Sequence, residues 1–176
     1  MQHFRSLLYT ILALLTTAAT TACAAGAEGS APSKGDVPPN YAGRQLDGAD
    51  VSIEPGDGKA YVISFWASWC GPCLQELPVL VNIQRIAGPE KMRVIAVNIE
   101  DRDVYRKLER QIRDLGLTST FDLNGKAQET YRVKAIPHMI IVGNDGRISS
   151  VRKGYAKAAL EDLAADLNQA LAAAGK

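Results

Sequence analysis

Short apolar runs alternate along this chain with segments of helical spacing. Residues 61–66 and 94–98 are strongly apolar runs, the pattern typical of strands buried on both faces. Apolar residues three and four positions apart follow each run, over residues 70–86 and 104–115, and predict two amphipathic helices. Strand, helix, strand, helix in this order builds parallel β-α-β units, so the pattern predicts an α/β fold.

Turn signals place the remaining elements. Asp47-Gly48 between strand-like flanks predicts a β-hairpin over residues 46–51, and a second hairpin is expected from residues 139–142 and 148–151 around an Asn-Asp-Gly turn. Pro78 is expected to kink the first helix, which Gly88-Pro89 ends. We expect residues 121–125 to be irregular, followed by a helical turn or two ending near Tyr131, and an amphipathic helix over residues 160–171 closes the chain.

The N-terminus has the features of an export signal. Residues 1–22 combine the positive charge of Arg5 with a nine-residue apolar core and small residues, and that core is too short for a span of about 20 residues. Residues 23–40 are rich in Ala, Gly, Ser and Pro, which predicts a flexible tether. The folded domain is expected to occupy residues 41–176.

Cys23 is the third and odd cysteine. Thr20-Thr21-Ala22-Cys23 resembles a bacterial lipoprotein signal, which predicts acylation of Cys23 and attachment to a membrane. The alternative is ordinary cleavage after Ala22-Cys23-Ala24, which obeys the same small-x-small rule and discards Cys23. Either route removes the unpaired thiol from the mature domain.

Charge and histidine content narrow the function. The formal net charge is +1, and loss of Arg5 leaves 19 basic residues (20 less 1) against 19 acidic ones. This balance gives no electrostatic footprint for nucleic acid. The two histidines are His3 and His138, which leaves little for a histidine-based metal site.

The segment Trp69-Cys70-Gly71-Pro72-Cys73 carries the candidate chemistry. It lies where a predicted strand gives way to a helix, and two cysteines at this spacing indicate a redox dithiol. The helix N-terminus would stabilise a thiolate at Cys70, the candidate nucleophile, and Cys73 lies one turn further on as the resolving thiol. A structural disulfide or half of a zinc site are the alternatives, but zinc needs about four ligands and the chain has no second pair. We expect no cofactor beyond the redox-active disulfide.

Residues 64–73 are similar to the thioredoxin signature almost residue for residue, and Ile136-Pro137 precedes a hairpin and a final helix, as in that fold. The export signal, residues 73–78, the inserted helical stretch before residues 131–133, and residues 141–148 look like the exported TlpA/ResA-like thioredoxins. The resemblance covers about residues 40–170. It implies a thioredoxin fold: a central mixed sheet flanked by helices, with an N-terminal β-hairpin extension and an inserted helical stretch. Arg132 and Ala135 depart from it, because glycines are frequent there in the family.

The resemblance also implies a substrate groove. Pro137 is expected to have a cis peptide bond facing the dithiol, which leaves the backbone of Ile136 free to pair with a substrate strand. The alternative is a trans proline at a strand start. Gly154 is expected at the neighbouring rim, Trp69 as a partly exposed wall, and Trp66 in the core.

Glu76 and His138 are the two polar residues considered for proton chemistry near the dithiol. Ser64 stands where thioredoxin has a buried aspartate that accepts a proton, and the resemblance points to Glu76, one helical turn after Cys73, as its substitute. The alternative is that Glu76 is a solvated helical residue. His138 could favour the Cys70 thiolate as an imidazolium, but we interpret it as an ordinary strand residue.

These features predict an extracytoplasmic thiol-disulfide oxidoreductase. We expect it to be a monomer on the periplasmic side, anchored to a membrane, that reduces disulfides in exported partner proteins such as apocytochrome c and is re-reduced by a membrane thiol electron donor. Gly71-Pro72 favours a reductant, although an oxidant of exported proteins remains an alternative. A Cu(I)-binding metallochaperone is an alternative from another class, since soft thiolates bind Cu(I). A peroxidase is a third option, whose peroxidatic cysteine normally stands on a different local motif.

Overall fold

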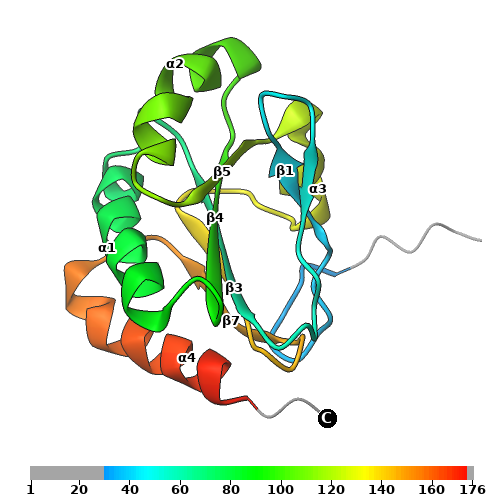
Figure 1. Ribbon diagram of the computed structural model, residues 1–176, viewed down its shortest axis with the longest axis vertical. Coiled ribbons are helices and arrows are strands. Elements are labelled where there is room, and N and C mark those ends of the chain that lie inside the picture. Colours follow the sequence, from blue (N-terminus) through cyan, green and yellow to red (C-terminus); the bar gives the residue numbers. More distant parts are fainter. Residues whose placement is uncertain (1–29, 174–176) are drawn as a thin grey trace, which may run out of the picture. The chain divides into compact units, whose positions relative to one another are not determined.

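The computed structural model describes residues 30–173, which form a seven-stranded mixed sheet covered on both faces (Figure 1). The strand order is β2-β1-β5-β4-β3-β6-β7. Parallel pairing joins β3 to β4 and β4 to β5, and antiparallel pairing joins the other neighbours. The strands are β1 (Tyr41–Arg44), β2 (Asp50–Ser52), β3 (Ala60–Trp66), β4 (Met92–Asn98), β5 (Thr118–Phe121), β6 (His138–Val142) and β7 (Ile148–Lys153). The predicted α/β class, both hairpins and the parallel units are confirmed.

Helices lie on both faces of the sheet. They are α1 (Gly71–Ala87), α2 (Arg102–Arg113), α3 (Lys126–Thr130) and α4 (Leu160–Ala172), with 3₁₀ turns η1 (Leu123–Gly125) and η2 (Lys157–Ala159). Apolar side chains of α1, α2 and α4 pack on one face of the sheet. On the other face α3 packs together with side chains of the β1–β2 hairpin, which is itself one end of the sheet (Figure 1). Successive residues of a strand face opposite sides of the sheet. In β3, Val62 and Trp66 therefore pack in the core under α1, α2 and α4, whereas Ile63 and Phe65 pack in the core on the other face. Pro78 lies inside α1, as the sequence predicts.

The strand β5 corrects one expectation, because residues 118–121 form a strand where no strand was predicted. The Thr-Ser-Thr segment lacks an apolar run, and its hydroxyls bond to distant residues instead. Thr120 Oγ1 donates to the carbonyl oxygen of Ala42 at 2.8 Å, and Tyr105 donates its hydroxyl to Ser119 Oγ at 2.8 Å. Gly43 adjoins this strand so closely that a Cβ there would lie 2.5 Å from Thr120 Oγ1. Long-range pairing therefore determines this strand.

The compact unit begins before the predicted boundary at residue 41, since it extends from Ala31. Gly35 donates its N–H to the carbonyl oxygen of Ile148 at 2.8 Å, and Ile148 donates back to Asp36 at 2.9 Å. Tyr131 donates its hydroxyl to the carbonyl oxygen of Pro39. Residues 31–40 therefore belong to the folded unit rather than to a tether, because these bonds order a segment whose composition alone would leave it flexible. The predicted export signal and Cys23 lie outside the described residues.

Arg132 has a left-handed backbone conformation, with φ of +54°. The sequence departs from the thioredoxin-like pattern at this position, where glycine is frequent. Glycine is the residue that adopts a positive φ without steric cost. The departure therefore places a strained residue two positions after the end of α3, remote from the dithiol in sequence.

Candidate active site

Cys70 and Cys73 form a disulfide at the N-terminus of α1. Cys70 is the N-cap residue, and its Sγ accepts a hydrogen bond from the N–H of Cys73 at 3.3 Å. Cys70 is 5% exposed and Cys73 fully buried, whereas the preceding Trp69 is 69% exposed. After reduction the free N–H groups of the first turn would stabilise a thiolate at Cys70. The geometry therefore fits Cys70 as the attacking sulfur and Cys73 as the protected, resolving one.

Ile136, Pro137 and Gly154 lie at the same edge of the sheet as the dithiol. His138 pairs with Phe65 across β6 and β3, so Pro137 stands beside the end of β3 that leads into the dithiol. The Ile136–Pro137 peptide bond is cis, as predicted, and Gly154 donates its N–H to the carbonyl oxygen of Pro137 at 2.8 Å. Within residues 30–173 the backbone of Ile136 makes no backbone hydrogen bond. An extended segment could therefore pair with it.

The side chain of Glu76 is buried on the inner side of α1 and is not solvated. It is 2% exposed, and Ser64 Oγ donates a hydrogen bond of 2.7 Å to Glu76 Oε2. Burial raises the pKa of Glu76 to about 7, although the hydrogen bond from Ser64 and the charge of Arg152 pull it down. A carboxyl with this pKa exchanges its proton near neutral pH, which suits a proton donor and acceptor.

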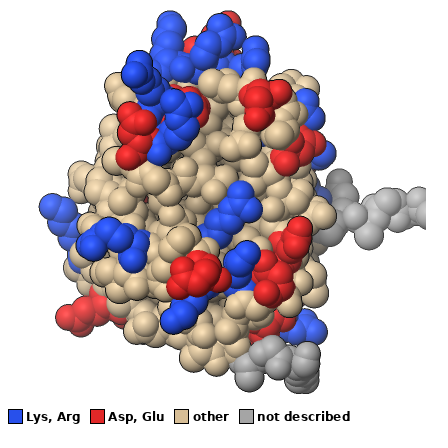
Figure 2. All heavy atoms as spheres, in the orientation of Figure 1, with Lys and Arg blue, Asp and Glu red and all other residues tan. Residues whose placement is uncertain are grey.

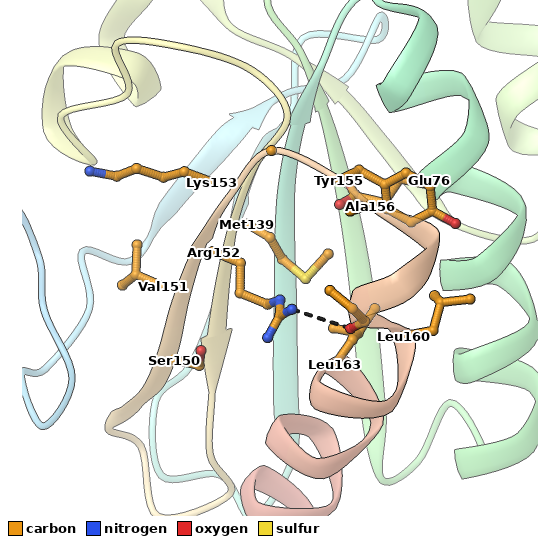
Figure 3. Close-up of a pocket in the computed structure, with 12 residues that line it drawn as sticks. Glu76, Met139, Ser150, Val151, Arg152, Lys153, Tyr155, Ala156, Leu160 and Leu163 are labelled. Carbon is orange, nitrogen blue, oxygen red and sulfur yellow. Dashed lines mark hydrogen bonds between the residues drawn. The ribbon is translucent and has the colours of Figure 1, made fainter.

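A cavity of about 450 Å³ opens beside Glu76, between β7 and the start of α4 (Figure 3). Arg152 lines it and turns toward α4, where its Nη1 donates to Asp166 Oδ2 at 2.6 Å and its Nη2 donates to the carbonyl oxygen of Ala159 at 3.4 Å. Met139 pairs with Ser64 on one side and Arg152 on the other, so the three residues form one row on this face. Arg152 could not be identified from the sequence, because its proximity to Glu76 follows from that register.

His138 lies on the opposite face of the sheet from α1. Its ring packs edge-on against Phe65 and is 3% exposed, and neither ring nitrogen has a hydrogen-bond partner in the described part of the chain. Burial, with a smaller contribution from Lys153, lowers the pKa of His138. His138 is the first residue of β6, which confirms its interpretation as a strand residue. Trp66 is buried, as expected.

Glu100 is a site residue that the sequence reasoning missed. It follows β4, and its carboxylate accepts hydrogen bonds from both the N–H and the hydroxyl of Ser68, two residues before Cys70. The available signal was a polar pair at the end of a buried strand: Asn98 is the last residue of β4, and Glu100 follows two residues later. The carboxyl ends of parallel strands meet at one edge, so this pair adjoins the loop after β3.

The surface and the remaining side chains add little further chemistry. Figure 2 shows Lys and Arg gathered over α2, with both signs of charge interspersed over the rest of this face. Across residues 30–173, no three His, Cys, Asp or Glu side chains are grouped so as to hold a metal ion. None of the helices in that range combines the length and apolar character that a bilayer span requires.

Sequence and structure comparisons agree with this geometry. The Redoxin family matches residues 33–168. The thioredoxin-like protein YneN of Bacillus subtilis (strain 168) is 30% identical over 127 residues, 69% of this chain and 72% of YneN. The thiol-disulfide oxidoreductase ResA of Bacillus thuringiensis subsp. konkukian (strain 97-27) is 26% identical over 120 residues, 68% of this chain and 69% of ResA.

Among solved structures, a candidate thiol:disulfide interchange protein, DsbE, from Chlorobium tepidum superposes with a TM-score of 0.71 at 29% identity. The match covers 80% of this chain and 99% of that one. The predicted thioredoxin fold and the TlpA/ResA-like resemblance are confirmed. With its Cys70–Cys73 pair at the N-terminus of α1, this chain belongs to the Redoxin family and is a ResA-like thiol-disulfide oxidoreductase.

Proposed function

We propose that this oxidoreductase reduces disulfides in exported partner proteins, such as apocytochrome c, outside the cytoplasm. The observation that carries the proposal is the dithiol at a helix N-terminus beside a free backbone edge at Ile136, with Trp69 exposed next to it. An extended substrate segment that pairs with Ile136 would bring its disulfide to Cys70. Gly71-Pro72 between the cysteines supports the reducing direction, and the export signal predicted over residues 1–22 supports the location.

The reaction follows from the accessibility of the two sulfurs. The Cys70 thiolate attacks one sulfur of the substrate disulfide, which forms a mixed disulfide and releases the other substrate sulfur as a thiolate that takes up a proton. Cys73 then loses its proton and attacks Cys70 Sγ. The second substrate thiol leaves, and the Cys70–Cys73 disulfide remains. Two electrons pass to the substrate, so a thiol donor, here a membrane electron carrier, has to reduce the pair again.

We assign Glu76 as the group that accepts the proton of Cys73. Both side chains are buried and lie one turn apart on α1, and the raised pKa of Glu76 allows it to accept a proton near neutral pH. Pro137, Ile136, Gly154 and Trp69 form the proposed substrate groove. No cofactor other than the disulfide takes part in this scheme.

The reduction potential of the Cys70–Cys73 pair tests the direction. A value near that of thioredoxin, about −270 mV, supports a reductant, whereas a value near about −120 mV would make the protein an oxidant.

Insulin reduction should be lost in both Cys70→Ala and Cys73→Ala, and turnover surviving in either variant would contradict the dithiol mechanism. Copper titration of the reduced protein addresses the metallochaperone alternative: tight Cu(I) binding without insulin reduction would favour it.

The location rests on Cys23. We propose that Cys23 is acylated and anchors the domain, as a monomer, to a membrane, which keeps it concentrated near its electron donor. Mass spectrometry of the mature protein tests this proposal. An N-terminal Cys23 carrying an acyl mass is expected, and an unmodified N-terminus at Ala25 would refute lipid anchoring without affecting the redox chemistry.

A further inference from the structure

The carboxylate of Glu100 holds the loop that leads into the dithiol. It accepts hydrogen bonds from the N–H of Ser68 at 2.6 Å, from the hydroxyl of Ser68 at 2.8 Å and from Asn98 Nδ2 at 3.0 Å. The N–H of Glu100 in turn donates to Asn98 Oδ1 at 2.9 Å, which fixes the two side chains relative to each other. Both oxygens of Glu100 are therefore engaged, and Ser68 is bound through two of its atoms.

Two backbone hydrogen bonds, which do not involve Glu100 or Ser68, hold the two ends of this loop. The N–H of Ile99 donates to the carbonyl oxygen of Trp66 at 3.0 Å, and the N–H of Cys70 donates to that of Ala67 at 3.1 Å. Trp69, between Ser68 and Cys70, is largely exposed and contributes little packing. Ala67 is fully buried in the core, and the contact that holds the remainder of the loop before Cys70 is the one between Ser68 and Glu100.

The other charged groups near Glu100 do not share this role. Asp101, Arg102 and Asp122 line a cavity with Glu100, but none of them hydrogen-bonds to Ser68 within the described residues. The pKa of Glu100 is lowered overall. Burial acts to raise it, but the hydrogen bonds from Ser68 and Asn98 act in the opposite direction and outweigh burial. Glu100 is therefore ionised at neutral pH, and hydrogen bonds to an ionised carboxylate are short and strong.

We propose that Glu100 is a positioning residue for thiol-disulfide exchange: through Ser68 it sets the place of Cys70 Sγ against the first turn of α1, and so the degree to which that turn stabilises the Cys70 thiolate. Glu100 itself does not contact the substrate. Loosening the loop should weaken the stabilisation of the Cys70 thiolate by the first turn of α1, and so raise the pKa of Cys70. Simple loss of a nearby negative charge would lower that pKa instead, so the sign of the change separates positioning from electrostatics.

The experiment uses the reduced protein and two readouts. One is the rate of Cys70 alkylation by iodoacetamide as a function of pH, located by peptide mapping, and the other is the second-order rate constant with oxidised glutathione at pH 7. The variants are Glu100→Gln, Ser68→Ala and the double variant. Asp101→Asn is the matched control, since it removes one negative charge from the adjacent residue without touching the loop.

Glu100→Gln should raise the pKa of Cys70 and slow the glutathione reaction about three- to tenfold, the range expected when part of a charge-assisted contact is lost. Ser68→Ala should act in the same direction, and the double variant should be no slower than Glu100→Gln, because both changes break one contact. Asp101→Asn should neither raise the pKa of Cys70 nor slow the glutathione reaction.

An unchanged or lowered pKa of Cys70 in Glu100→Gln would overturn the proposal, as would additive effects in the double variant. If Glu100→Gln does not fold, Ser68→Ala alone decides, because it keeps the charge of Glu100: an unchanged alkylation profile refutes positioning and a raised pKa supports it. None of these readouts depends on whether the natural substrate is an exported protein.

Discussion

Replacing Glu76 by Gln should change how the stability of the protein depends on pH. The substitution keeps the size of the side chain and an oxygen that can accept the hydrogen bond from Ser64, but removes the ionisable group. In the wild type, burial raises the pKa of Glu76 from 4.5 to about 7. Below pH 4.5 the carboxyl is protonated in both folded and unfolded chains. Above that pH the unfolded chain releases the proton first, so folding becomes less favourable.

The magnitude follows from the two pKa values. Stability associated with the protonated group is fully present below pH 4.5 and is lost as the pH rises through about 7, at about 1.4 kcal/mol for each pH unit between them. The total is about 3 kcal/mol. Because Gln does not titrate, the free energy of unfolding of Glu76→Gln minus that of the wild type should increase by this amount from pH 4.5 to pH 8.

Urea unfolding of the oxidised protein, followed by tryptophan fluorescence at several pH values, measures this difference. Glu90→Gln is the matched control, because it makes the same substitution at an exposed side chain. A difference for Glu76→Gln that stays constant with pH, or that shrinks as the pH rises, would refute the reasoning. The same variant should alter the pH profile of the cysteine reactions if Glu76 accepts the proton of Cys73.

Three further changes test other contacts. Ser64→Ala removes a hydrogen bond that lowers the pKa of Glu76, so that pKa should rise further in a carboxyl NMR titration; a fall would contradict the assignment. Arg132→Gly should raise the free energy of unfolding by about 0.5–1 kcal/mol, because relief of left-handed strain of about 1–2 kcal/mol exceeds the added chain entropy; Arg132→Ala, which keeps the strain, should not. Tyr131→Phe should cost about 1 kcal/mol and speed amide exchange in residues 31–40, since it removes the bond to Pro39; unchanged exchange would argue against this anchor.

The elements with strong local patterns could be predicted from the sequence. Strongly apolar runs identified β3 and β4, and three- and four-residue spacing identified α1 and α2. The pattern missed β5, whose hydroxyl side chains bond to Ala42 and Tyr105, and it assigned residues 31–40 to a tether although they bond to β7 and to Tyr131. In both segments contacts with distant residues, rather than local apolar content, specify the conformation.

The site divides in the same way. Cys70 and Cys73 could be found from their spacing, because a nucleophile at a helix N-cap and a partner one turn on are local features. The resemblance to ResA-like proteins pointed to Glu76, but the sequence left it open whether this residue is solvated or buried. Glu100 was missed, since its partner Ser68 is 32 residues away in the chain.

By itself the sequence determined the dithiol, its place at the start of a helix and the thioredoxin-like order of elements, because each depends on neighbouring residues. The tertiary structure decided the protonation behaviour around that dithiol. Packing of α1 on β3 buries Glu76 against Ser64 and raises the pKa of Glu76. The alternation of strand residues places His138 beside Phe65, on the face of the sheet away from α1. Alignment of the carboxyl ends of β3 and β4 places Glu100 against the loop before Cys70. These effects arise from burial and from contacts between elements, which local patterns do not encode.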